Sequence, residues 1–162
     1  MSRLDSFIRR MQAQRACLDW AVGEIADLPG VVGEFGLGNG RTYDHLREKL
    51  PGRDIVVFER KLAAHPGSLP PDHLLLMGDI HDTLPKAVER WGGQMALIHY
   101  DLGTGDDARN AALAKDVAPG LTALMRPGGV IVADYHIPAE GWTVEPLPEG
   151  VPEGRYFLYR AT

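Results

Sequence analysis

The sequence predicts an α/β protein with a doubly wound, mainly parallel sheet of seven strands. Short runs of β-branched and apolar residues alternate along the chain with helix-like segments, which is the pattern of parallel strands joined by crossover helices. Most of these runs are apolar almost throughout, as expected for strands that helices cover on both faces. Two further strand-like runs close the chain across a Pro/Gly-rich turn, so we expect an antiparallel hairpin at one edge.

The length and composition favour one domain. A chain of 162 residues can bury a single good-sized core, so we expect one domain over residues 1–162, with an N-terminal helix in 1–28 and a Rossmann-like core in 31–162. The net charge is −5 with no cluster of Lys and Arg, which argues against a nucleic-acid binder. A single cysteine excludes an internal disulfide. No segment is apolar enough for a membrane span or a signal peptide, so a cytoplasmic protein is expected.

The N-terminal segment predicts a long amphipathic helix that ends at residues 27–30. Apolar residues recur at steps of three and four, interrupted by Arg15: Leu4, Phe7, Ile8, Met11, Leu18, Val22 and Ile25. The apolar residues near its free end need cover, either from the same chain or from a partner. We expect a homo-oligomer, a dimer or higher, in which this end packs against another copy.

The remaining elements follow in alternation. Strands are expected over 31–35, 54–59, 73–77, 95–100 and 129–134, with closing strands over 142–147 and 155–160. Helices are expected over 41–50, over 82–91 with Pro85 in the first turn, and over 106–125 with a break near Pro119. Residues 61–71 predict a loop with at most a short helix.

The first strand runs into a turn with three alternate glycines, Gly36, Gly38 and Gly40. A glycine turn between a strand and a helix N-terminus is typical of a site that holds a nucleotide. The dinucleotide fingerprint would require a further glycine at Arg41. Glu59 ends the second strand nineteen residues after Gly40, a position from which a carboxylate can accept hydrogen bonds from ribose hydroxyls.

The pattern E-x-G-x-G-x-G over residues 34–40 resembles motif I of the class I S-adenosylmethionine (SAM) dependent methyltransferases. The turn LMRPGG over residues 124–129 is also typical of that family. The resemblance covers residues 31–136 and is closest to the small stand-alone bacterial type. It implies SAM as cofactor and methyl transfer to a small-molecule acceptor. From the charge and the lack of a long apolar segment we expect no nucleic-acid or membrane partner. The residues that it assigns to the cofactor are Glu34, Phe35, Gly36, Gly38, Gly40, Glu59, Asp79 and Ile80, with Asp79 on the adenine amino group and Ile80 on the ring.

Candidate catalytic groups stand at the ends of the fourth and fifth strands. A general base for an oxygen or nitrogen acceptor could be His99, Asp101 or His136. Asp101 and Asp134 also match the metal-binding acids of catechol-type O-methyltransferases, although Tyr135 stands where those enzymes have Asn. Two acids could still hold Mg²⁺, or could bond only to loop backbone. We predict no metal site.

Two alternatives remain open at this point. One is a non-catalytic module that binds SAM or adenosine, which the lack of a separate substrate domain allows. The other is an NAD-type oxidoreductase, which the glycine spacing and the turn over residues 124–129 disfavour.

Overall fold

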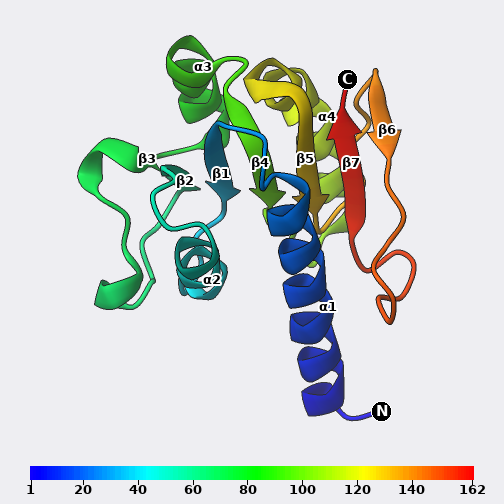
Figure 1. The fold of residues 1–162 in the computed structure, drawn as a ribbon. Coiled ribbons are helices and arrows are strands. Elements are labelled where there is room, and N and C mark those ends of the chain that lie inside the picture. The colour runs from blue at the N-terminus through cyan, green and yellow to red at the C-terminus, as the bar shows by residue number, and fades with distance from the viewer.

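A computed structural model describes all 162 residues and confirms the predicted fold class. Seven strands form one sheet in the order β3-β2-β1-β4-β5-β7-β6 (Figure 1). The strands are β1 (Val31–Phe35), β2 (Ile55–Glu59), β3 (Leu75–Met77), β4 (Met95–Tyr100), β5 (Met125–Ala133), β6 (Trp142–Val144) and β7 (Phe157–Ala161). The helices are α1 (Arg3–Glu24), α2 (Arg41–Lys49), α3 (Ile80–Trp91) and α4 (Asp107–Leu124).

The sheet is parallel from β3 to β5, and β7 pairs antiparallel with both β5 and β6. All six residues of β4, the central strand, are buried, as expected for a strand covered on both faces. One face packs under α1 and α2, where Leu18 and Leu46 meet Leu97. The other packs under α3 and α4, where Leu84 and Leu121 join Ile98. The carboxyl ends of the five parallel strands, β1 to β5, therefore share one edge (Figure 1).

Helix α1 divides into a packed half and a free half. Ser2 and Asp5 form a capping box at its start, which satisfies free backbone N–H groups there. The face that packs on the sheet begins at Ala13 and includes Cys17 and Ala21, so small residues let the helix approach closely. The N-terminal half extends past the carboxyl edge of the parallel strands (Figure 1), and Phe7 is 47% exposed. The predicted stripe thus contacts the core only through its last part.

Helix α4 runs without a break through Pro119, contrary to the sequence prediction. Proline costs a helix one backbone hydrogen bond, but α4 packs closely against α3 at this point. A Cβ on Gly120 would lie 2.5 Å from the Leu84 side chain of α3. This close packing of α4 on α3 lies directly beside Pro119 and stabilises the helix there. Helix α3 begins at Ile80, earlier than predicted, which places Pro85 in its second turn.

Smaller differences lie outside the core. Residues 61–71 carry one 3₁₀ turn, Pro66–Ser68, and a second, Asp72–Leu74, shortens β3 at its start. β6 ends at Val144, three residues before the predicted end. The helices are too short or too polar to cross a membrane.

Candidate functional site

The three glycines of the turn after β1 have different structural roles. All three adopt positive φ, at +91° for Gly36, +52° for Gly38 and +85° for Gly40, a region that suits glycine. A Cβ on Gly36 would lie 2.4 Å from the Asp101 carbonyl oxygen, and one on Gly40 2.6 Å from Ser68 Cβ. A Cβ on Gly38 would have no neighbour within 4 Å. The outer glycines therefore allow close packing, and the middle one leaves backbone open to a ligand.

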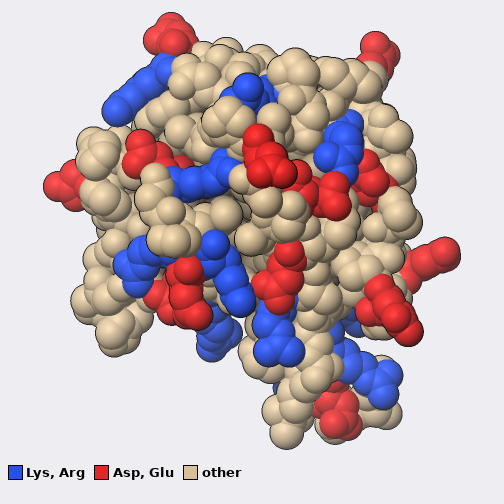
Figure 2. Space-filling view, in the orientation of Figure 1, with Lys and Arg blue, Asp and Glu red and all other residues tan.

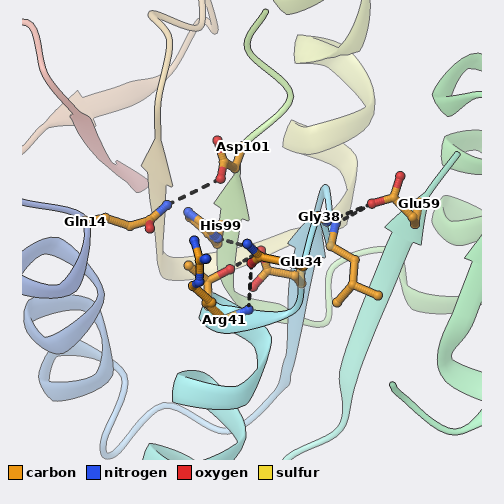
Figure 3. A network of polar contacts seen from close by, with 10 residues as sticks. Gln14, Glu34, Gly38, Arg41, Glu59, His99 and Asp101 are labelled. Atoms are coloured by element: carbon orange, nitrogen blue, oxygen red, sulfur yellow. Dashed lines mark hydrogen bonds and ion pairs between the residues drawn. The ribbon is translucent and has the colours of Figure 1, made fainter. Parts of the chain in front are cut away.

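Glu59, at the end of β2, accepts hydrogen bonds from the backbone of this turn. Its Oε2 accepts hydrogen bonds from the backbone N–H groups of Leu37 and Gly38, both at 2.9 Å (Figure 3). Its Oε1 accepts from the N–H groups of Arg60 and Lys61, at 2.7 and 3.1 Å. The acid predicted from its spacing is thus joined directly to the glycine turn.

A cavity of about 340 Å³ lies beside Glu59, between β2, β3 and α4; we call it the β2–β3 hollow. Its apolar lining comes from Phe58, Ile80, Leu102, Ala112 and Leu113. Asp79 lies at the same cavity and caps α3, where its Oδ1 accepts from the N–H of His81 at 2.8 Å. Its Oδ2 stays free. A flat ring between apolar side chains, with a carboxylate oxygen at hand, fits this space.

A second cavity of about 330 Å³, the glycine-turn hollow, adjoins the first, and Glu59 and Leu102 line both. One wall is the glycine turn with Asp101. The opposite wall belongs to α1 and contains Phe7, Arg10 and Met11 from its free half and Gln14 from the start of its packed half. The overhang of α1 therefore completes the site.

The third cavity, about 460 Å³, is the β5–β7 hollow. It shares Arg10 and Gly103 with the glycine-turn hollow, and its other lining includes Asp134, Arg155 and Tyr156. The three cavities thus follow one another along the carboxyl edge of the sheet, where α/β proteins bind ligands.

Asp101 and Asp134 stand between the second and third cavities. Gln14 Nε2 donates to Asp101 Oδ2 at 3.3 Å (Figure 3), and the Gly103 N–H donates to Asp134 Oδ2 at 3.0 Å. Asp134 Oδ1 is buried without a partner. Burial first, and then the neighbouring Asp101 carboxylate, raise the pKa of Asp134 to about 7. This carboxyl pair can therefore hold a proton near neutral pH.

Glu34 and His99 form a fully buried pair beneath the glycine turn. Glu34 Oε1 contacts His99 Nδ1 at 2.6 Å and accepts from Thr42 Oγ1 at 3.1 Å (Figure 3). Burial alone disfavours the charged imidazole, but the charge and hydrogen bond of Glu34 outweigh it and raise the pKa of His99. Glu34 Oε2 and His99 Nε2 have no partner. The pair links β1 to β4 under the site and lines none of the three cavities.

The structure brings some predicted residues together and leaves others apart. Gly36, Gly38, Glu59 and Asp101 line the glycine-turn hollow. Of the other predicted residues, Asp79 and Ile80 line the β2–β3 hollow and Gly40 lies at the N-terminus of α2. Phe35 lies in the core, where its ring stacks on that of Phe58 with centroids 4.0 Å apart. His136 is exposed, and its ring lies edge-on to that of Phe157. The assigned role of His136 therefore gains no support from its position.

Several lining residues were missed from the sequence. Arg10 and Gln14 are four residues apart on α1, so both lie on one helical face, and this polar pair beside an apolar stripe was the available signal. Arg155 and Tyr156 lie in the final turn and carried no such signal. The side chains of His, Cys, Asp and Glu nowhere form a group of three that could hold a metal ion.

The sheet order and the glycine turn define the class: a Rossmann-like α/β protein with a nucleotide-type site at the carboxyl edge of its parallel strands. Over residues 1–161 the sequence matches the model of a family described as S-adenosyl-L-methionine methyltransferase. The crystal structure of an S-adenosyl-L-methionine methyl transferase from Silicibacter pomeroyi DSS-3 is 46% identical, with a TM-score of 0.93 over 100% of this chain and 99% of that one. The chain therefore belongs to the S-adenosyl-L-methionine methyltransferase family.

More distant structures share the fold alone. Human methyltransferase-like protein 13, solved in complex with SAH, is 12% identical with a TM-score of 0.62, over 93% of this chain and 81% of that one. TrmN from Thermus thermophilus is 18% identical with a TM-score of 0.52, over 88% of this chain and 48% of that one. No curated protein matches the sequence.

The protein is thus a SAM-dependent methyltransferase, and SAM is its cofactor. Family membership sets aside the non-catalytic module and the NAD-type oxidoreductase that the sequence had left open.

Proposed function

We propose that this enzyme methylates a hydroxyl or amine of a small-molecule acceptor that binds in the β5–β7 hollow and reaches Asp101. The observation that carries this proposal is the continuity of the three cavities. The β2–β3 and glycine-turn hollows meet at Glu59, and the β5–β7 hollow adjoins the glycine-turn hollow at Gly103 and the β2–β3 hollow at Thr104. A cofactor and an acceptor can therefore lie end to end along one edge of the sheet.

The first two cavities fit SAM. Ile80 and Leu102 would contact the adenine ring, Asp79 Oδ2 is free to accept from its amino group, and Glu59 would accept from the ribose hydroxyls. The open space at Gly38 would let the amino-acid end approach the backbone. Because Glu59 also accepts from the turn, we expect its carboxylate to give up some of those bonds on binding.

When bound, SAM supplies a methyl group on a sulfonium, and the carbon–sulfur bond breaks with its electron pair on sulfur as the acceptor's lone pair bonds to carbon. Asp101 would receive the proton that the acceptor loses. Gln14 holds the Asp101 carboxylate toward the cavity. Asp134 stores a proton beside it, because its pKa is raised to about 7. His99, fully buried within β4, would act as a positioning residue rather than touch the acceptor.

The size and charge of the site favour a small acceptor. A cavity of about 460 Å³ lies within the range for sites that bind small molecules. Figure 2 shows acidic and basic side chains interspersed over the side of the molecule seen in Figure 1, and the net charge is −5, so that side offers no broad basic surface for nucleic acid. Since α1 lines the site, we further propose that residues 1–28 and 31–162 act as one domain.

The test is methyl transfer from labelled SAM into a cell extract separated into small molecules, nucleic acids and proteins. We expect label in the small-molecule fraction with wild-type enzyme. Asp101→Asn should abolish that label and still bind S-adenosylhomocysteine in calorimetry. Label in nucleic acid or protein would refute the small acceptor, and undiminished labelling by Asp101→Asn would refute the role of Asp101.

A further inference from the structure

Two arginines line the β5–β7 hollow without an acidic partner. Arg10 and Arg155 take part in none of the ion pairs of the chain. Arg160, by contrast, is paired with Glu24 and Glu145. Among the other arginines only Arg47 forms an ion pair, so what distinguishes Arg10 and Arg155 is that both line one cavity in a protein of net charge −5.

The two arginines come from opposite ends of the sequence. Arg10 projects from the free half of α1, and Arg155 precedes β7. Tyr156, next to Arg155, is only 3% exposed and lines the same cavity. Burial is the main reason why the pKa of the Tyr156 hydroxyl is raised. The charge of Asp101 raises this pKa further and the charge of Arg10 lowers it, while no hydrogen bond of the chain contributes. The hydroxyl is therefore a free, protonated donor near Asp101 and Arg10.

The remaining polar lining has the opposite charge or none. Asp134 belongs to the cavity and Asp101 stands at its junction with the glycine-turn hollow, while Asn110 and Thr104 are neutral. An anionic group placed against the two acids would meet like charge, whereas against the arginines it would be attracted. The cavity is thus polarised, with cationic groups that could hold an anion and acidic groups that could take a proton.

Building on the proposed function, we propose that the methyl acceptor carries an anionic group, a carboxylate or a phosphate, that Arg10 and Arg155 hold while its hydroxyl or amine faces Asp101. The anion is an anchor and is not itself methylated. Guanidinium groups suit this role, since each presents a fork of donors that matches carboxylate and phosphate oxygens.

A competing role for Arg10 is to bind the carboxylate of SAM itself, because Arg10 also lines the glycine-turn hollow. Arg41 lines that hollow as well and can serve the cofactor there. Arg155 lines only the β5–β7 hollow. The Arg155 variant therefore separates anchoring of the acceptor from anchoring of the cofactor.

The experiment first separates the labelled products on an anion-exchange resin and identifies the methylated molecule, and then measures kinetics with the unmethylated form of that molecule as acceptor. We expect the label in the anionic fraction. Arg155→Gln should raise the KM for that acceptor by about tenfold to hundredfold, as expected for loss of a hydrogen bond to a charged group, with the affinity for S-adenosylhomocysteine unchanged. Arg9→Gln is the matched control, since Arg9 precedes Arg10 on α1, lines none of the three cavities and should leave both values unchanged.

Each other outcome decides against the proposal. Label confined to neutral or cationic small molecules would overturn the anionic class and leave the proposed function standing. An unchanged KM with Arg155→Gln would overturn the anchor. Label in macromolecules would overturn the proposed function and this inference together.

Discussion

Replacing Asp134 by Asn should make the stability of the protein less dependent on pH. The pKa of this carboxyl rises from 3.8 to about 7, chiefly through burial and then through Asp101. Between those two pH values the folded state holds a proton that the unfolded chain has released. Stability therefore falls as pH rises through this window. Asn keeps an oxygen for the Gly103 N–H and cannot ionise, so it removes this part of the pH dependence.

The magnitude follows from the displacement of the pKa. A move from 3.8 to about 7 corresponds to at most about 4 kcal/mol, since each pH unit is worth about 1.4 kcal/mol. Asp134 is partly exposed and shares its proton with Asp101, so screening and coupling reduce this value. We expect Asp134→Asn to unfold with a free energy on the order of 1–2 kcal/mol above that of wild type at pH 8, and equal to it near pH 4.

Urea denaturation of both proteins from pH 4 to pH 8, followed by circular dichroism, measures this difference. Glu149→Gln is the control, because Glu149 is exposed and its removal should leave the pH profile of wild type in place. A constant difference between wild type and Asp134→Asn at every pH would contradict the reasoning, since a packing effect does not titrate.

Three further predictions concern the cofactor and the assembly. Gly38→Asn suits the φ of +52° and should place a side chain in the open space, which should lower the affinity for S-adenosylhomocysteine at least about tenfold. Gly52→Asn, also at positive φ, should leave this affinity unchanged. Equal affinities of the two variants by calorimetry would contradict the prediction. Glu59→Gln should cost the same ligand about 1–3 kcal/mol, and an unchanged dissociation constant would exclude the ribose contact. The exposed Phe7 and Ile8 should pack against a second copy, so light scattering should report an oligomer that Phe7→Ser with Ile8→Ser dissociates; a wild-type monomer at micromolar concentration would reject it.

The parts of the site that were predictable are those that one stretch of sequence encodes. Gly36, Gly38 and Gly40 indicate the turn by their spacing, and Glu59 is located by its distance from them. Strand ends of a parallel sheet share an edge, so the position of Asp101 directly after the fourth predicted strand is enough to place it at the site. Local pattern was sufficient to locate these residues, and their roles toward the cofactor and the acceptor stay predictions.

The rest of the site depends on contacts between distant segments. Glu34 meets His99 because the two residues are register partners across β1 and β4, which requires the strand order. Arg155 and Arg10 line one cavity only because the last turn lies beside α1 in the folded chain. Helix α4 passes through Pro119 because the packing of Gly120 against α3 outweighs a local helix breaker. Such tertiary effects override local propensity.

We expect the overhang of α1 to give the enzyme an entrance without a hinged lid. The first two turns of the helix have no sheet beneath them, and in a protomer whose helix end is not covered by a second copy this end should fray on a submicrosecond timescale. Residues from Phe7 onward form the wall of the glycine-turn hollow, so each unwinding event opens that wall to solvent. The Ser2–Asp5 capping box opposes unwinding by about 1 kcal/mol. A bound ligand that contacts Arg10 or Gln14 would rewind these turns behind it, so amide exchange in residues 3–12 should slow on binding while exchange in the β4 core stays the same.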